Sequence, residues 1–458
     1  MERASNEPPT LSRFSRFSIL LSSTTTSICR LIHPGEITVS DFPCASTIAS
    51  RCNADGEFRF AARSWTGALT LRSPEHAVTV GFKEGVANNL TQTALGRTFT
   101  LAAPANIWNA LFAAVPPRLA NDIAVLIRSG LMELEADAID FAQYYAAIMR
   151  VIELIRPRVT SRGPTEPVRS NGAFDAPVGR YVHLDIEGQD YRIYFEEAGQ
   201  GIPLLLQHTA GCHGAQWRHL LECKAITDHF RLIAYDLPFH GKSIPPVGPR
   251  WWEEEYRLTG DFIRSVPVRL AEMLSLHKPV FMGCSVGGLL ALDLAAKHSD
   301  LFDAVISLEG ALKIELDYDA LSDLWHPQIS NEYKARLMNA LMSPTSPEAY
   351  RKETSMIYAA GWPPLFRGDL YYYAVDFDLR ETARNIDTAR CAVHILSGEY
   401  DSSGTIEHGM AAHKAIAGST WSPMKGLGHF PMSEDPEGFL MHLLPVLAEV
   451  RLRQQKIR

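Results

Sequence analysis

The segment from Pro279 to Ala296 constrains the fold of this chain more than any other. Its sequence, PVFMGCSVGGLLALDLAA, opens with a short apolar run, passes through a Gly-Cys-Ser-Val-Gly turn and ends in leucines and alanines typical of a buried helix. A strand, a sharp turn and a helix are the context that the G-x-S-x-G pattern requires. The two outer glycines leave room for close packing of helix on strand. The pattern makes Ser285 a candidate nucleophile, and a glycine-rich turn without chemistry is the alternative.

A serine hydroxyl becomes a nucleophile only when a histidine, held by a carboxylate, takes its proton. After an elbow of this kind, the acid and then the histidine follow in chain order. Asp401 comes just after the apolar strand 392–396, at the strand end where open parallel sheets bind ligands, and His429 lies in a loop after the last strand. We therefore predict a triad of Ser285, Asp401 and His429.

Other acids and bases in this half of the chain remain open as alternatives. Glu399 lies two residues before Asp401, and Glu309 ends the strand that follows the elbow. His240 and His208 are alternative bases, although we expect both to hold loops or to line the site. His208 is also a candidate substrate-binding residue because it ends a strand at the predicted site.

An acyl-transfer site needs two N–H groups for the oxyanion. The residue after the nucleophile, Val286, supplies one of them. The second is expected from the loop after the strand 203–207, where either Thr209 or Ala210 could donate. The sequence does not choose between these two.

From residue 179 onward, uninterrupted apolar strands alternate with helices. This pattern is typical of a parallel sheet covered on both faces, so we predict an α/β domain over residues 179–454 with a mostly parallel sheet. Residues 311–388 contain no strand and are rich in aromatic side chains, which predicts a helical cap over the site. We expect Trp325 and Trp362 of this cap to contact the substrate.

Residues 36–157 form a smaller, separate unit in this reading. Strands are predicted at 57–60, 68–71 and 77–82, and helices at 105–114 and 137–154, which makes it an α+β domain. Residues 159–178 are rich in Pro, Gly, Ser and Arg and read as a linker. Residues 1–34 are rich in Ser, Thr and Arg, which favours a disordered tail, with a transit peptide as the alternative.

Composition excludes several functions. A net charge of −8 argues against a nucleic-acid surface, and no apolar run approaches the roughly 20 residues of a membrane span. The seven cysteines are scattered without C-x-x-C spacing, which indicates reduced thiols and a cytoplasmic location, or an organelle if the tail is a transit peptide. His208 and His213 flank a short Gly/Cys segment, but nothing has zinc-site spacing, so we predict no metal and no cofactor.

Five segments of residues 179–453 together resemble the α/β-hydrolase superfamily, in the order the family has them. They are the loop His208–Gly211, Asp236-x-Pro-x-His-Gly-x-Ser243, the elbow, Gly398-x-x-Asp401 and Gly428-His429-Phe-Pro431. The resemblance implies the α/β-hydrolase fold and the triad predicted above. One departure is Thr209, where many relatives have glycine. A serine at the elbow excludes the relatives that use an aspartate there, such as haloalkane dehalogenases and epoxide hydrolases.

The N-terminal unit is similar, in the segments 99–111 and 130–155, to the sterol carrier protein domain. In that family a tryptophan-bearing helix helps to close an apolar tunnel, which implies lipid binding. A structural or dimerisation domain is the alternative.

These observations predict a serine hydrolase that cleaves an ester, thioester, lactone or activated C–C bond. The expected partner is a small to medium apolar acyl substrate, without nucleic acid or stable membrane insertion, and a homodimer is left open. A lipid-binding or scaffold protein with an inert hydrolase half is one alternative. An acyltransferase or cofactor-free haloperoxidase on the same site is another.

Overall fold

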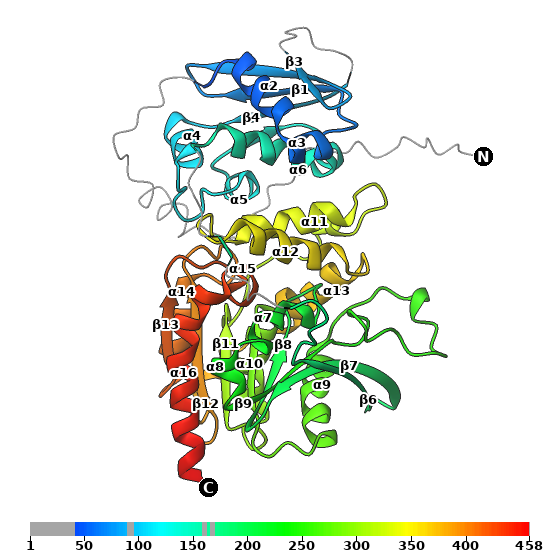
Figure 1. Cartoon of the computed structure of the whole chain (residues 1–458), viewed down its shortest axis with the longest axis vertical. Coiled ribbons are helices and arrows are strands. Elements are labelled where there is room, and N and C mark those ends of the chain that lie inside the picture. Colours follow the sequence, from blue (N-terminus) through cyan, green and yellow to red (C-terminus); the bar gives the residue numbers. More distant parts are fainter. Residues whose placement is uncertain (1–41, 89–95, 158–162, 165–169, 458) are drawn as a thin grey trace, which may run out of the picture.

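The computed structural model describes residues 42–88, 96–157, 163–164 and 170–457. The predicted tail at residues 1–34 and residues 159–162 and 165–169 of the predicted linker lie outside the described residues. Two separate sheets organise the rest of the chain, one of five strands and one of eight. The smaller unit stands at one end of the molecule and the eight-stranded sheet at the other, with helices of the cap between them (Figure 1).

The N-terminal unit is built on the five-stranded sheet, in the order β3-β2-β1-β4-β5. Strands β1 and β4 run parallel, and the other neighbours are antiparallel. The long helix α6 packs against the sheet because an apolar stripe of nine residues is buried along it, and Asp137 caps its first turn by accepting from the N–H groups of Ile139 and Asp140. The elements are β1 (Gly67–Arg72), β2 (Ala77–Lys83), β3 (Val86–Asn88), β4 (Arg97–Ala102), β5 (Glu133–Glu135), α2 (Ala45–Ala54), α3 (Gly56–Ala61), α4 (Ala105–Phe112), α5 (Ile123–Arg128) and α6 (Ala138–Ile155).

The strand predicted at residues 57–60 is wrong, because these residues belong to helix α3. Asp55 caps this helix, and its carboxylate accepts from the N–H of Phe58 at 2.7 Å. Its other partner is Arg150 of α6, 2.7 Å away. A cap and a tertiary ion pair thus decide the conformation of six residues whose apolar side chains alternate as in a strand. The strands predicted at 68–71 and 77–82 and the helices predicted at 105–114 and 137–154 are confirmed.

The C-terminal unit contains the eight-stranded sheet, in the order β13-β12-β11-β10-β8-β9-β7-β6. Its six strands from β13 to β9 are parallel, while β6 and β7 form an antiparallel edge. This confirms the predicted α/β fold with a mostly parallel sheet. The strands are β6 (Val178–Ile186), β7 (Gln189–Gly199), β8 (Ile202–Gln207), β9 (Phe230–Tyr235), β10 (Val280–Cys284), β11 (Ala304–Leu308), β12 (Ala392–Gly398) and β13 (Thr420–Met424).

Helices cover both faces of this sheet, as completely buried strands demand. All five residues of β10 and all five of β11 are buried. The helix after the elbow is apolar all round and buried over ten of its residues. The covering helices include η1 (Gly214–Trp217), α7 (Arg218–Leu221), α8 (Lys224–Thr227), α9 (Gly260–Met273), α10 (Val286–Lys297), α14 (Ile406–Ala415), α15 (Pro431–Glu434) and α16 (Pro436–Ile457).

The cap lies between β11 and β12, and helices are the only regular elements that its described residues form. It lies over the carboxyl ends of the parallel strands, and α11 and α12 separate the sheet from the N-terminal unit (Figure 1). Its elements are η3 (Ser322–Leu324), α11 (Asn331–Leu337), η4 (Met338–Leu341), α12 (Glu348–Ala359), α13 (Leu365–Tyr371), the π-helix η5 (Tyr372–Asp376) and η6 (Ala383–Asn385).

A cluster of charged side chains joins the N-terminal unit to the cap. Glu153 on α6 pairs with Arg150 at 3.0 Å and with Arg336 on α11, and Lys352 on α12 pairs with Glu57. Although burial raises the pKa of Glu153, the surrounding Arg336, Lys352 and Arg150 lower it to about 2. The carboxylate is therefore ionised, and separating the two units would leave it without its cap partners.

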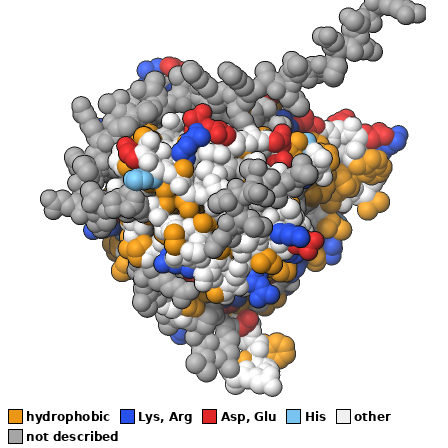
Figure 2. Space-filling view, turned by 90° about the horizontal axis from the view of Figure 1, so that it is seen from above, with side chains coloured by type: hydrophobic (Ala, Val, Ile, Leu, Met, Phe, Trp, Pro, Cys, Tyr) orange, Lys and Arg blue, Asp and Glu red, His pale blue; other side chains and the backbone are white. Residues whose placement is uncertain are grey.

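In the part of the chain that the structure describes, every helix is too short or too polar to cross a bilayer. The cysteines described there are free thiols. The outer face of the N-terminal unit mixes acidic, basic and hydrophobic side chains without a large field of one charge (Figure 2).

Candidate active site

Ser285 occupies the sharp turn between β10 and α10. Its backbone lies in the left-handed half of conformational space, at φ 58° and ψ −114°, which is rare for a residue with a side chain and marks stored strain. The turn is possible only because the flanking glycines allow close contact: a Cβ on Gly283 would lie 2.3 Å from the carbonyl oxygen of Gly287. The Ser285 side chain is nearly buried, with 5% of the residue exposed.

The structure brings the predicted acid and base together. Asp401 follows β12, and its Oδ2 lies 2.6 Å from Nδ1 of His429, which follows β13. Asp401 also accepts from the N–H groups of Ser403, at 2.7 Å, and Gly404, at 3.0 Å. Burial alone would raise the pKa of Asp401, but the imidazole and these N–H groups lower it below its ordinary value. An ionised Asp401 therefore holds the ring of His429 in one orientation.

His429 lies directly against the elbow. Its carbonyl oxygen accepts from the thiol of Cys284, the residue before the nucleophile, at 3.0 Å. Burial raises the pKa of this thiol well above its ordinary value, so Cys284 packs beneath the turn as a neutral group. The loop that carries His429 is held by the buried Glu434, which accepts from the N–H of Gly428 and, at 3.2 Å, from the hydroxyl of Ser346 in the cap.

Glu309, an alternative acid in the sequence, lies beside Asp401. Both its oxygens accept from the N–H of Gly398, at 2.9 and 2.8 Å, and its proximity helps to lower the pKa of Asp401. Burial and the negative charge of Asp401 raise the pKa of Glu309 well above its ordinary value. Glu309 is therefore a neutral acid that supports Asp401, and the contact to His429 belongs to Asp401.

The two candidate donors in the loop after β8 differ in what they bind. The N–H of Thr209 donates to Oε1 of the buried Gln216 at 3.0 Å, so it is already used. Among the described residues no hydrogen bond engages the N–H of Ala210. On the other side, Val286 is the first residue of α10, where the N–H groups have no partner within the helix. The geometry therefore favours Ala210 and Val286 as the pair facing an oxyanion.

His208 does not lie where a substrate contact is expected. It is completely buried, its Nδ1–H donates to the carbonyl of Thr209 at 2.8 Å, and its Nε2 accepts from the N–H of Leu237 at 3.1 Å. Both ring nitrogens are used by the backbone, so the substrate-binding prediction for His208 is corrected to a loop-holding role. Burial and the nearby His240 lower its pKa well below the ordinary value, which keeps the ring neutral.

A buried aspartate of the cap holds the same loop from above. Asp369 on α13 accepts from the N–H of Gly211 at 2.6 Å, from Nε2–H of His240 at 2.9 Å and from the hydroxyl of Tyr256 at 3.0 Å. Both Asp369 and His240 have completely buried side chains. His240 therefore helps to hold the loop beside the oxyanion position, and His429 remains the candidate base.

The two tryptophans predicted to contact substrate do not lie at the cavity described next. Trp325 is 45% exposed at the surface. Trp362 packs among Phe239, Trp251 and Tyr256, with ring centroids 5.4–6.3 Å away. Neither side chain lines that cavity, and substrate contact by Trp325 and Trp362 stays a prediction.

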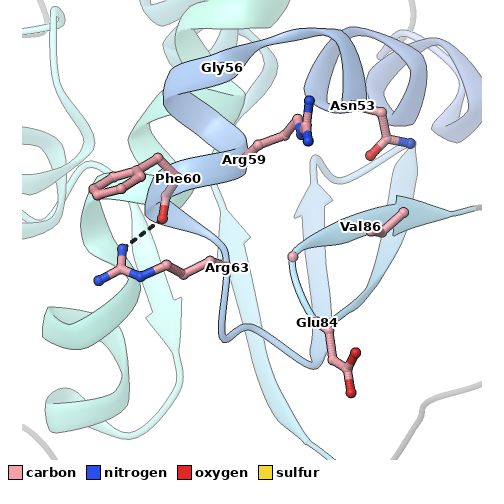
Figure 3. Close-up of a pocket in the computed structure, with 8 residues that line it drawn as sticks. Asn53, Gly56, Arg59, Phe60, Arg63, Glu84 and Val86 are labelled. Carbon is pink, nitrogen blue, oxygen red and sulfur yellow. Dashed lines mark hydrogen bonds between the residues drawn. The ribbon is translucent and has the colours of Figure 1, made fainter.

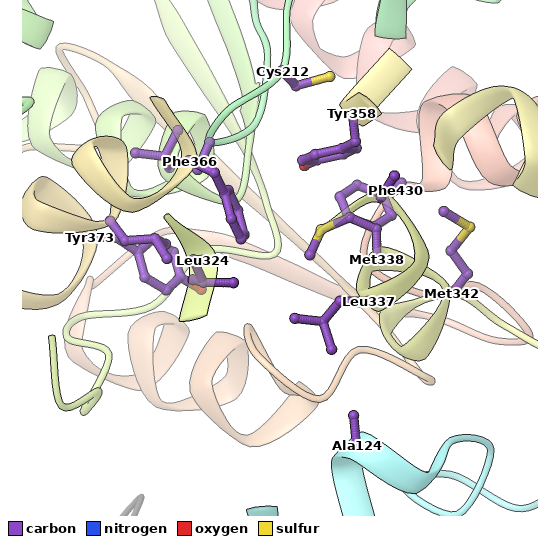
Figure 4. Packing of buried hydrophobic residues seen from close by; sticks show 14 of the residues in the cluster. Ala124, Cys212, Leu324, Leu337, Met338, Met342, Tyr358, Phe366, Tyr373 and Phe430 are labelled. Atoms are coloured by element: carbon purple, nitrogen blue, oxygen red, sulfur yellow. The ribbon is translucent and has the colours of Figure 1, made fainter. Parts of the chain in front are cut away.

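An apolar cavity of about 170 Å³ lies under the cap. Tyr373 lines this cavity, and its hydroxyl forms a hydrogen bond with that of Ser403 at 2.9 Å. Burial raises the pKa of Tyr373, and the hydroxyls of Ser403 and Ser285 partly offset that rise, which places Tyr373 near the nucleophile. Phe366 packs against Gly211. Figure 4 shows Phe366, Tyr373 and their neighbours on η3 and η4 turned toward a common centre. Through Tyr373 and Phe366 the cavity adjoins the elbow and the loop after β8, and the rest of its wall is mainly apolar.

A second hollow belongs to the N-terminal unit and is distant from Ser285. It is open to solvent, has a volume of about 710 Å³ and lies between α3 and the β2–β3 turn. Figure 3 shows Arg59, Arg63 and Glu84 around it, with Arg63 donating to the carbonyl of Phe60 at 2.8 Å. Charged side chains therefore share its rim with apolar ones. Lipid binding by this unit stays a prediction.

Several residues of the site carry no sequence signal. Asp369 and Gln216 lie outside every motif, and only the folded cap brings Asp369 to the loop. Tyr373 belongs to a Tyr-Tyr-Tyr run, which indicated aromatic packing but not which ring faces the serine. Within the described residues no group of three or more His, Cys, Asp and Glu side chains could hold a metal ion.

Residues 202–339 match the family model described as alpha/beta hydrolase fold. Together with the sheet order and the elbow, this match shows that the C-terminal unit has the α/β-hydrolase fold. A thermophilic esterase from Thermogutta terrifontis, solved with malate bound, superposes on 59% of this chain and 99% of its own with a TM-score of 0.51 and 20% identity. That likeness shows the fold alone.

Two curated relatives resemble the same unit in sequence. The pimeloyl-[acyl-carrier protein] methyl ester esterase of Vibrio cholerae is 30% identical over 124 residues, which are 26% of this chain and 42% of that protein. The alignment thus spans less than half of that relative. The 2-hydroxy-6-oxo-6-(2'-aminophenyl)hexa-2,4-dienoic acid hydrolase of Metapseudomonas resinovorans is 24% identical over 293 residues, 58% of this chain and 91% of that protein.

Proposed function

We propose that the C-terminal unit is a serine hydrolase for a carboxylic ester, thioester or lactone with a small to medium apolar acyl group. The observation that carries this proposal is the buried Asp401–His429 pair, 2.6 Å apart, set against an elbow whose serine has a strained backbone. Strain of this kind is found at functional sites because it aims a side chain, and a merely structural turn gains nothing from it.

Each step of the reaction has a residue in this proposal. Ser285 attacks the acyl carbon as His429 takes its proton at Nε2, and Asp401 keeps the proton on Nδ1 and stabilises the imidazolium that forms. The N–H groups of Val286 and Ala210 receive the oxyanion. The imidazolium returns its proton to the leaving group, and water, activated by the same histidine, releases the acyl group from Ser285.

The substrate class follows from the cavity and the relatives. The wall of the cavity is formed chiefly by leucine, methionine and aromatic side chains, which favour an apolar group through burial. One relative is named for a methyl ester, which agrees with an ester substrate. The other is named for a dienoic acid, and with it cleavage of an activated C–C bond becomes the second candidate reaction. Both reactions use the same nucleophile and base and differ in the bond presented to Ser285.

A fluorophosphonate probe tests the proposal, because it reacts covalently only with an activated serine. We expect the full chain to be labelled and Ser285→Ala to lose both the label and all turnover of aryl esters. The matched control is Ser265→Ala, which removes a hydroxyl on α9 that donates to the carbonyl of Phe262. Labelling that persists in Ser285→Ala, or a folded wild type that neither reacts nor hydrolyses any ester, would contradict the assignment.

A further inference from the structure

The cavity that Tyr373 and Phe366 line beside the elbow is not closed by the cap alone. Part of its wall comes from the N-terminal unit, through Leu119, Val125 and Ser129 and the stems of two arginines. Figure 4 shows Ala124, on the same helix α5, on the far side of Leu337 from the centre of the cluster. The remaining lining residues of the cavity are contributed by the cap and by residues 402–405, which follow Asp401. Three parts of the chain, far apart in sequence, therefore enclose one space.

The segment 116–129 is tied to both of its neighbours. Asn121 is buried, and its Nδ2 donates to the carbonyls of Ala340, at 3.0 Å, and Met342, at 3.2 Å, in the cap. Arg118 forms a two-pronged pair with Glu407 on α14, at 2.9 and 2.6 Å, and so reaches the helix after the Asp401 loop. These bonds fix the position of the segment over the cavity, because side-chain amides and guanidinium forks are directional.

Leu119 shows that this position has a structural cost. Its backbone lies at φ 67°, a conformation that is an outlier for a bulky residue, and only 8% of the residue is exposed. The strain turns an apolar side chain into the cavity wall. Strained residues persist where the surroundings over-determine them and cluster at ligand sites.

We propose that residues 116–129 of the N-terminal unit form the outer wall of the substrate pocket and set the length of the apolar group that Ser285 can process. This inference deepens the hydrolase function proposed above and rests on it. The ligand class is a straight or cyclic hydrocarbon group whose reacting carbonyl lies at Ser285 and whose far end contacts Leu119 and Val125. The N-terminal unit is then part of the specificity site of the enzyme.

The expected effect follows from the burial of methylene groups. Each buried CH₂ contributes about 0.8 kcal/mol, a factor of about four in kcat/KM, and a pocket wall that excludes one methylene too many discriminates by roughly 10–200-fold. Val125→Trp should therefore lower the ratio of kcat/KM for p-nitrophenyl octanoate over the acetate at least tenfold. Leu119→Ala should raise the same ratio, because it lengthens the pocket.

The matched control is Val86→Trp in the full chain. Val86 belongs to β3 of the same unit and is 57% exposed, and it borders the open hollow far from the serine. This control adds the same side chain to the same domain and should leave the ratio at its wild-type value. If Val125→Trp does not fold, Leu119→Ala measures the same wall in the opposite direction.

A second readout separates this inference from the function beneath it. Octanoate should raise the Tm of the wild type and of Val86→Trp, and Val125→Trp should abolish that shift, whether or not the chain turns over an ester. Loss of the shift in Val125→Trp alone supports the wall even if no ester is hydrolysed. The proposed wall would be refuted if both cavity variants, Val125→Trp and Leu119→Ala, had the same octanoate-to-acetate ratio and the same octanoate-induced Tm shift as the control. It would also be refuted if octanoate did not raise the Tm of the wild type.

Discussion

Asp369→Asn is the substitution that best tests how the cap supports the catalytic loop. Asp369 accepts from Gly211, Tyr256 and His240, and the imidazole of His240 also lies 2.9 Å from the carbonyl of Pro238 at its other nitrogen. Both ring nitrogens of His240 therefore face acceptors and carry protons. Burial lowers the pKa of His240, but the charge of Asp369 and these bonds outweigh it and raise the pKa above its ordinary value.

Asparagine has nearly the same shape but no charge. It can still accept from Gly211 and donate to Tyr256. The main loss is therefore the negative charge beside the completely buried imidazolium of His240. Removing one member of a buried pair costs about 3–5 kcal/mol. With about 2 °C per kcal/mol for a domain of roughly this size, the Tm should fall by about 6 °C or more. We expect kcat to fall at least tenfold as the Ala210 N–H loses its position, less than the hundredfold or more of a missing oxyanion donor.

The pH dependence has a definite sign. A histidine whose folded pKa is raised contributes stability that is complete below 6.5, its ordinary pKa, and is lost as pH rises through the folded pKa. Thermal melts between pH 5 and pH 9 should show this loss in the wild type and not in Asp369→Asn. The control is Tyr256→Phe, which removes one neutral donor and costs about 1 kcal/mol. Equal melting temperatures and equal kcat for the two variants would refute the reasoning.

Two further perturbations have outcomes set by the structure. Gly283→Ala places a methyl group 2.3 Å from the backbone oxygen of Gly287, so the elbow must open. We expect a lower Tm and loss of fluorophosphonate labelling. Labelling at the wild-type level would contradict the close packing of α10 on β10 at the elbow. Burial raises the pKa of Glu434 to about 7, so the stability it contributes is complete below pH 4.5 and is lost as pH rises to about 7. Relative to Glu434→Gln, the wild type should lose about 3 kcal/mol in urea unfolding across that range, and a constant difference between the two proteins would show that Glu434 titrates normally.

The C-terminal fold was predictable because its strands are buried on both faces. A run such as Phe230–Tyr235 is too short and too apolar to be anything but a central strand between helices, and the structure places β9 at the same residues. That Asp401 and His429 lie side by side was predictable for a related reason: they follow β12 and β13, and neighbouring parallel strands end at one edge of the sheet. In the N-terminal unit, helix α3 was not predictable, because Asp55 and its ion pair to α6 decide it.

The finer parts of the site were out of reach of the sequence. The choice of Ala210 over Thr209 depends on where the side chain of Gln216 points, which no local pattern encodes. His208 was expected to contact the substrate because it ends a strand, but tertiary packing engages both of its ring nitrogens with the backbone. Asp369 was missed because a single acidic residue in a helical cap has no spacing signal.

The charged cluster between α6 and the cap also decides which parts of the molecule can move together. Breaking it would leave Glu153 and Arg336 as unpaired charges in a poorly hydrated interface. The ion pair between Arg118 and Glu407 lies at the surface, where Glu407 is 59% exposed and solvent can replace its partner. The weaker joint is therefore the one to the hydrolase core. If the cap moves relative to the sheet, the charged cluster would keep the N-terminal unit attached to it, so the two would move as one body.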